Sequence, residues 1–149
     1  MGVPTNNNDP RKATALKSIA TRETPVDFWA TFDFSAAAWE DRAALAGAQI
    51  APGSHVIDYG CANMKLEAAL APGCIYHPVD LIARDHRTTV ADLNKTIPSL
   101  HGDVAVGLGL LEYILDVPRF LREVATRAKR GVFSYHPLDR NSSVPTLTD

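Results

Sequence analysis

The sequence predicts an α/β protein built on a doubly wound, mainly parallel sheet of about five strands. From residue 55 onwards, short runs rich in β-favouring residues alternate with segments of helical periodicity. The run 104–110, VAVGLGL, is almost wholly apolar, which is typical of a parallel strand buried on both faces. A length of 149 residues suits one domain with a single core.

The chain before this alternating region is expected to form an arm and a lid. Residues 1–24 are polar and lack apolar periodicity, so we expect a flexible N-terminal arm followed by one domain over residues 25–149. The segment 25–34, PVDFWATFDF, is rich in aromatic residues and is expected to pack on the core as a lid, with a substrate-recognition surface as the alternative. Ser35 is suited to cap a helix that continues to about residue 48, where the sequence APGS ends it.

The alternating region contains five expected strands: residues 55–59, 74–81, 88–93, 104–110 and 132–136. A helix is expected over 63–70 and another from Asp116, a capping residue, to about residue 128. Lys129 and Arg130 suit the negative end of that helix, and Gly131 suits its exit. Strands separated by helices pair in parallel, and the expected order is the Rossmann-like 3-2-1-4-5.

The stretch 55–70, HVIDYGCANMKLEAAL, joins the first expected strand to a helix through Gly60. Glycine lets the backbone bend sharply and approach a ligand, and the start of a helix favours a negative group. Twenty residues later, Asp80 ends the second expected strand, where a carboxylate can accept hydrogen bonds from both ribose hydroxyls. The spacing therefore indicates a nucleotide-like ligand, with a plain turn glycine and a solvated carboxylate as the simpler alternative.

Four motifs, in order, resemble those of class I S-adenosylmethionine-dependent methyltransferases. VIDYGCANMKLEAAL resembles the first motif, hydrophobic-hydrophobic-D/E-x-G-x-G-x-G, and YHPVDL is similar to the second. TVADLNKTIP is similar to the stretch whose acidic residue faces the adenine amino group, and DVAVGLGLLEYILDVPRFLREV resembles the strand-four motif with its helix. The resemblance covers residues 55–137, over half of the chain.

This resemblance implies a binding site for the cofactor S-adenosylmethionine. Asp58 would orient the amino group of its methionine end, Asp80 would bind the ribose, and Asp92 would accept from the adenine amino group. Leu81 and Leu93 would sandwich the adenine ring. The implied cofactor-binding residues are Asp58, Gly60, Cys61, Ala62, Asp80, Leu81, Asp92, Leu93, Leu108 and Gly109. The backbone of the last two would pass beside the methionine end.

The chain departs from the family pattern at three positions and at its C-terminal end. Ala62 and Met64 stand where the pattern has glycine, and Tyr113 stands where the family often has histidine. A complete family member continues after strand five with a helix and two more strands. Here only a short polar stretch follows, so the sixth and seventh strands are expected to be lacking. Strand five would then be an edge through which the chain could form a homo-oligomer.

Composition limits the possible partners. A formal net charge of −2, with no basic block longer than Lys129-Arg130, argues against nucleic acid as the main partner. No run approaches the ~18 apolar residues of a membrane span, so no membrane association is expected. Cys61 and Cys74 form neither a metal-binding pattern nor a disulfide framework, which suits free thiols in a cytoplasmic protein.

Other residues offer chemistry with less support. Four neighbours suggest a metal cluster: His77, Asp80, Asp85 and His86. Strand alternation puts His77 and Asp80 on opposite faces, so no metal site is predicted. His136, at the end of strand five, is the candidate general base, with a surface role as the alternative. Cys61 lies where a helix start would favour a thiolate, but no base accompanies it, so packing is its expected role.

The leading hypothesis is methyl transfer from S-adenosylmethionine to an acceptor that the sequence does not identify, either a small molecule or a polypeptide. This reaction relies on holding nucleophile and methyl group in line. The first alternative is a non-catalytic binding or assembly domain that lacks the C-terminal strands. The second is a nicotinamide-dependent dehydrogenase, although the loop lacks the third glycine of that fingerprint.

Overall fold

The computed structural model describes residues 9–135, which form a five-stranded, wholly parallel sheet in the order β3-β2-β1-β4-β5. The strands are β1 (His55–Tyr59), β2 (Ile75–Asp80), β3 (Thr89–Val90), β4 (Gly102–Leu108) and β5 (Ala128–Ser134). The predicted Rossmann-like α/β class and strand order are thereby confirmed. Strand β1 lies at the centre, where Val56 is paired with Tyr76 of β2 and Val104 of β4.

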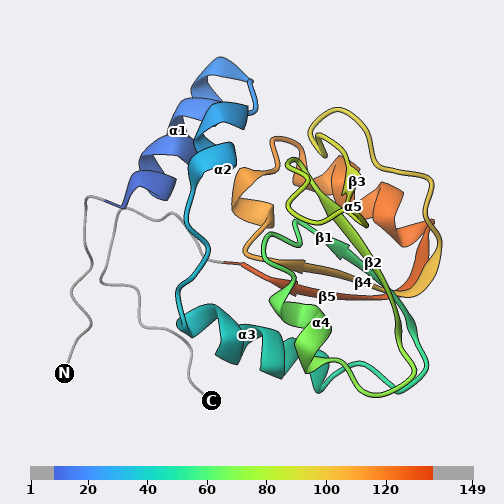
Figure 1. The fold of residues 1–149 in the computed structure, drawn as a ribbon. Coiled ribbons are helices and arrows are strands. Elements are labelled where there is room, and N and C mark those ends of the chain that lie inside the picture. The colour runs from blue at the N-terminus through green and yellow to red at the C-terminus, as the bar shows by residue number, and fades with distance from the viewer. Residues whose placement is uncertain (1–8, 136–149) are drawn as a thin grey trace, which may run out of the picture.

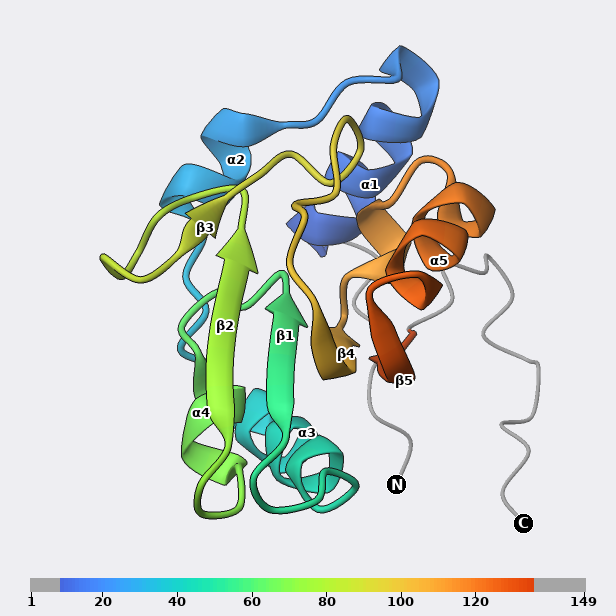
Figure 2. The ribbon, with the colours of Figure 1, turned by 90° about the vertical axis from the view of Figure 1, so that its right-hand side faces the viewer.

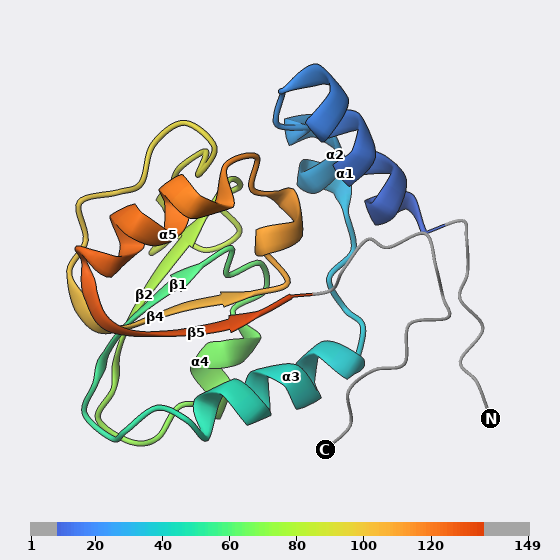
Figure 3. The ribbon, with the colours of Figure 1, turned by 180° about the vertical axis from the view of Figure 1, so that it is seen from behind.

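Helices cover both faces of this sheet (Figure 1). Helices α3 (Ala38–Gly47) and α4 (Lys65–Ala69) lie on one face, and α5 (Val117–Ala125) lies on the other, as Figure 3 shows from behind. Helices α1 (Pro10–Thr21) and α2 (Val26–Thr31) lie beyond the carboxyl ends of β1 and β2, near the short 3₁₀ helix η1 (Leu111–Tyr113) (Figure 2). The N-terminal elements therefore stand over the edge where parallel sheets bind ligands.

Alternation along β1 divides the core into two layers. Val56 packs with Ala46 of α3 and Leu66 of α4, whereas the next residue, Ile57, packs on the α5 side with Phe120. All of these side chains are at most 5 % exposed, and burying one large apolar side chain contributes about 1.5–3 kcal/mol. The two apolar layers hold the helices against the sheet and so fix the positions of the strand ends.

The segment expected to be a flexible arm contains a helix, α1, which the sequence analysis did not predict. Asp9 caps the helix by accepting a hydrogen bond from the amide of Arg11 at 2.9 Å, and Pro10 occupies the first turn. Only Ala15 and Ser18 are buried on α1. So narrow a buried stripe leaves no apolar periodicity in the sequence.

Several element boundaries differ from those predicted, most clearly those of β3 and of the junction between α5 and β5. Strand β3 has only two residues in place of the expected six, Thr89 and Val90. Helix α5, capped by Asp116 as predicted, ends at Ala125, and Lys129, Arg130 and Gly131 belong to β5 instead of to the helix end. Pairing with β4 over the whole length of β5 outweighs the local end-of-helix signals. Among residues 9–135, no helix is long and apolar enough to cross a membrane.

Candidate functional site

Three carboxylates lie at the carboxyl ends of neighbouring strands. Asp58 is in β1, Asp80 is the last residue of β2, and Asp92 follows β3 by two residues. Parallel pairing aligns these strand ends, because Tyr59 is paired with Val79 and Asp80 with Val90. Asp58 and Asp80 are 3 % and 8 % exposed, which is rare for aspartates and requires specific partners.

The loop after β1 keeps a glycine-like backbone even where its glycines are replaced. Gly60 has φ +75°, and a Cβ added there would lie 3.1 Å from a methyl carbon of Leu110. Ala62 and Met64 also have positive φ, at 45° and 57°. These are the two positions where the sequence departs from the glycine pattern. The loop therefore follows the conformation that glycine favours, at a cost of about 1–2 kcal/mol for each side chain.

Asp58 is a buried carboxyl group with one side-chain donor. The hydroxyl of Tyr76, on the neighbouring strand β2, donates to its Oδ2 at 2.6 Å. Burial raises the pKa of Asp58 to about 7, although the hydrogen bond from Tyr76 opposes this change and the nearby Asp80 charge adds to it. Near neutral pH, this carboxyl group therefore stands close to the midpoint of its titration.

Asp80 is bound by the protein on both oxygens. The amide of Ala62 donates to Oδ2 at 2.8 Å, so the carboxylate fixes the loop after β1. The amide of Ile82 donates to Oδ1 at 3.0 Å, and Nη1 of Arg84 donates to the same oxygen at 3.3 Å. A ribose that bound here would share Oδ1 with Arg84 or displace its guanidinium.

Arg84 also links Asp80 to the N-terminal segment. Its Nη2 donates to the carbonyl of Trp29 in α2, and its guanidinium lies 4.6 Å from the ring centre of Phe34. The Trp29 ring contacts the ring of Tyr113 edge-on, at 4.6 Å between centroids. The aromatic segment therefore packs over the strand ends, as the expected lid would.

Asp92 is also hydrogen-bonded to the N-terminal segment. The hydroxyl of Thr24 donates to Oδ1 at 2.9 Å, and the amide of Asn94 donates to that oxygen at 3.1 Å. The Asn94 side-chain amide donates both to Thr24 Oγ1 and to the carbonyl of Tyr113, each at 3.1 Å. Asp80 and Asp92, the two residues expected to bind an adenosine, thus both hold the N-terminal segment in place.

The remaining predicted site residues differ in their burial and in their hydrogen bonds. Leu81 is half-buried, whereas Leu93 is 6 % exposed and packs in the core on the α5 side. Leu108 ends β4, and the amide of Gly109 donates to Oγ of Ser134 in β5 at 2.8 Å. His136, the candidate general base, lies outside the described residues.

Cys61 does not have the thiolate character that a helix start would favour. Its side chain is 6 % exposed, and burial raises the pKa of the thiol, an effect strengthened by the charges of Asp58 and Asp80. Cys61 therefore stays protonated near neutral pH, which suits a packing role and not nucleophilic attack.

Three residues near the strand ends were not singled out from the sequence: Arg42, Tyr76 and Arg84. Tyr76 is two residues before Pro78 in β2, and its place beside Asp58 follows only from the β1–β2 register. Arg84 follows β2 closely enough to be noticed as a charged neighbour of Asp80. Arg42 lies three residues after Trp39 on α3, so helical spacing places both on one side of the helix.

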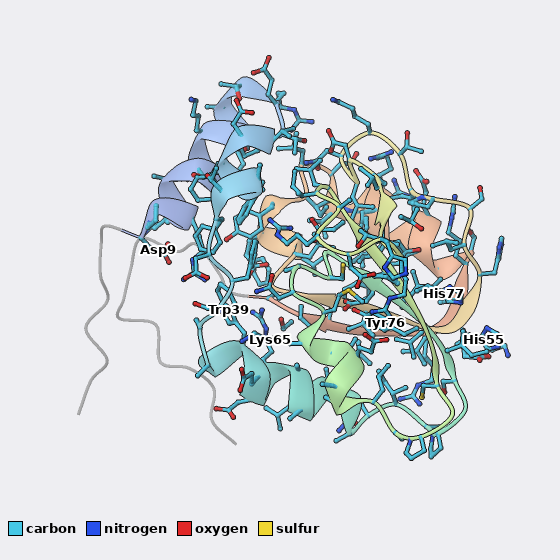
Figure 4. The ribbon with its side chains drawn as sticks, in the orientation of Figure 1. Asp9, Trp39, His55, Lys65, Tyr76 and His77 are labelled. Carbon is cyan, nitrogen blue, oxygen red and sulfur yellow. The ribbon has the colours of Figure 1, made fainter. Side chains whose placement is uncertain are left out.

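Within residues 9–135, no three His, Cys, Asp or Glu side chains are grouped so that they could hold a metal ion. The rings of His55 and His77 lie 6.0 Å apart, well away from Trp39 (Figure 4). The strand-end carboxylates are hydrogen-bond acceptors, so they suit a ligand with hydroxyl and amino donors. Such a ligand would displace Arg84 and Thr24 from these carboxylates.

A comparison with protein-family models gave no match, and a comparison with curated proteins gave none either.

Proposed function

We propose that this chain is an S-adenosylmethionine-binding methyltransferase domain. The observation that carries the proposal is the set of three carboxylates at adjacent strand ends, Asp58, Asp80 and Asp92, beside a loop with three positive-φ residues. In a Rossmann-like sheet of this order, ligands bind at that edge. The four sequence motifs that resemble methyltransferases fall on the same strand ends.

Each carboxylate has a role that suits its surroundings. Asp58 is buried and titrates near neutral pH, so a cationic amino group beside it would favour its charged form. Asp80 is suited to accept from ribose hydroxyls after the guanidinium of Arg84 moves, because among residues 9–135 its Oδ2 accepts only from the amide of Ala62. Asp92 is suited to accept from the adenine amino group in place of Thr24.

The bound cofactor would supply an electrophilic methyl group on a sulfonium. A lone pair of the acceptor would form the new bond to carbon while the carbon–sulfur bond breaks and sulfur keeps its electron pair. What the protein contributes to such a displacement is alignment and exclusion of water. The aromatic segment 25–34 is placed to provide that exclusion, because α2 lies beyond the carboxyl ends of β1 and β2 (Figure 2) and its Trp29 contacts Tyr113 of η1.

Calorimetric titration with S-adenosylmethionine and S-adenosylhomocysteine tests the proposal. We expect micromolar binding that Asp80→Asn weakens and Asp80→Ala abolishes, because only the asparagine keeps an acceptor for the Ala62 amide. The control is Asp41→Ala, an exposed position on α3, which should bind like the wild type. The absence of heat from a folded sample at high ligand concentration would refute the proposal, and an acceptor screen is justified only after binding is seen.

A non-catalytic binding or assembly domain is the second candidate. The observation that favours it is that Asp80 and Asp92 already have internal partners in Arg84 and Thr24. Among the described strands, β5 is the outer neighbour of β4, so it offers an edge for pairing with a second copy. Absence of cofactor binding, together with concentration-dependent self-association in sedimentation, would favour this candidate.

A further inference from the structure

Arg42 of α3 is a half-buried cation with one buried N–H donor, Nε, that has no acceptor among the described residues. Its Nε is buried and has no hydrogen-bond partner, and its guanidinium forms no ion pair within residues 9–135. A guanidinium carries five N–H donors, and leaving one of them buried without an acceptor costs about 1–3 kcal/mol. Such a group needs an explanation, and one explanation is a ligand that supplies the acceptors.

The guanidinium lies against the backbone at the carboxyl end of β4. A Cβ placed on Gly109 would be 2.6 Å from Nη1 of Arg42 and 3.2 Å from both Cζ and Nη2. Gly109 has φ +64°, so both its conformation and its missing side chain allow this close approach. Arg42 is thus positioned at the strand end that a parallel sheet uses for ligands, next to β1 with Asp58.

Aromatic packing holds Arg42 in this position. Its Cζ lies 5.9 Å from the ring centre of Trp39, and Cζ of Arg11 from α1 lies 5.5 Å from the same ring. Trp39 belongs to the first turn of α3 (Figure 4), and its ring also packs against Phe32 and Phe34, which follow α2. Arg11 is neutralised by Asp9, with Nη2 to Oδ2 at 2.6 Å, whereas Arg42 forms no such pair with a carboxylate in the part of the chain that the structure describes.

None of the charged groups near Arg42 among the described residues forms an ion pair with its guanidinium. Burial lowers its pKa, and the positive charge of Arg11 adds to this effect, while Glu112, Tyr113 and Asp58 oppose it without forming an ion pair with it. A planar guanidinium with free donors matches a carboxylate, which can accept two parallel hydrogen bonds.

We propose that Arg42 is the receptor for a carboxylate at the carboxyl end of β4. The inference rests on the proposed function only for the source of that carboxylate. One source is the methionine end of the cofactor, and the other is an acidic methyl acceptor. Both sources offer the same chemistry to Arg42, so the experiment has one arm for each.

The direct measurement is the Nε–Hε resonance of Arg42 in the ¹⁵N-labelled chain, assigned by its disappearance in Arg42→Gln. The chain is titrated with sodium acetate, with S-adenosylhomocysteine, and with acetate after saturation by S-adenosylhomocysteine. The matched control is Arg122, an exposed arginine on α5, which lies on the opposite face of the sheet from α3 (Figure 3). Its resonance should not move, which separates specific binding from ionic strength.

The second measurement is the affinity for S-adenosylhomocysteine and for its decarboxylated analogue, which lacks only the carboxylate. If the cofactor is the source, Arg42→Gln should weaken binding of the first about tenfold or more and leave the second unchanged, as expected for a charge-assisted pair. Arg42→Lys, which keeps the charge but loses the planar fork, should fall between.

An acidic acceptor is the source if acetate still moves the Arg42 resonance in the protein saturated with S-adenosylhomocysteine. If acetate moves the resonance but neither adenosyl ligand binds, the anion receptor stands and the proposed function fails. The inference itself is overturned if none of the titrations moves the Arg42 resonance while Arg42→Gln and Arg42→Lys, both folded by circular dichroism, bind like the wild type.

Discussion

The buried carboxyl group of Asp58 makes the stability of this protein depend on pH in an uncommon direction. Its folded-state pKa is about 7, against an ordinary value of 3.8, because the side chain is 3 % exposed. Between these two values the folded chain binds a proton that the unfolded chain has released. The contribution of Asp58 is therefore fully present below about pH 4 and is lost as the pH rises to about 7.

Asp58→Asn isolates this contribution. Asparagine has nearly the same shape, and its carbonyl oxygen can accept the hydrogen bond from Tyr76, but it does not titrate. A pKa difference of about 3, at about 1.4 kcal/mol for each tenfold change in proton affinity, corresponds to about 4 kcal/mol over the whole range. Between pH 4.5 and 7.5, the free energy of unfolding of the variant should rise relative to the wild type by about 3 kcal/mol.

Urea unfolding at pH 4.5, 6.0 and 7.5 measures this difference, with Asp27→Asn, at an exposed position on α2, as the control. Comparing variant with wild type removes the effect of the other titrating groups. A difference between Asp58→Asn and wild type that stays constant over this range would show that Asp58 keeps an ordinary pKa. Burial would then not raise the pKa of this carboxyl group.

Four further substitutions test the local structure. Gly60→Ala should lower the free energy of unfolding by more than Gly53→Ala, because both have φ +75° but only the first meets a neighbouring side chain; equal losses would contradict this. Ala62→Gly should raise stability by about 0.5 kcal/mol in thermal unfolding, since it relieves a positive φ. Arg84→Gln should speed amide hydrogen exchange in α2, and unchanged exchange would show that Arg84 does not hold that helix. Asp116→Ala should cost about 1 kcal/mol in urea unfolding through loss of the α5 cap.

Local sequence patterns were sufficient to predict the central strand and the order of the sheet. The bounds of β1 match residue for residue, and the strand order follows from alternating elements and the handedness of their connections. The acidic residues could be placed at strand ends because each lies in the last part of a recognisable strand or just after it. The prediction that Ala62 and Met64 depart from a glycine pattern also located the two strained positions of the loop.

The sequence by itself therefore determined the fold class, the central strands and which carboxylates lie near the strand ends, because those depend on periodicity and spacing over short stretches. Only the tertiary structure decided that Arg84 and Thr24 hold Asp80 and Asp92, and that Arg42 reaches Gly109. Those contacts join residues 4 to 68 positions apart, and their geometry depends on how helices dock on the sheet. The start of β5 also depends on tertiary structure. Lys129 and Arg130 belong to this strand because it pairs with β4, although their local sequence does not indicate a strand.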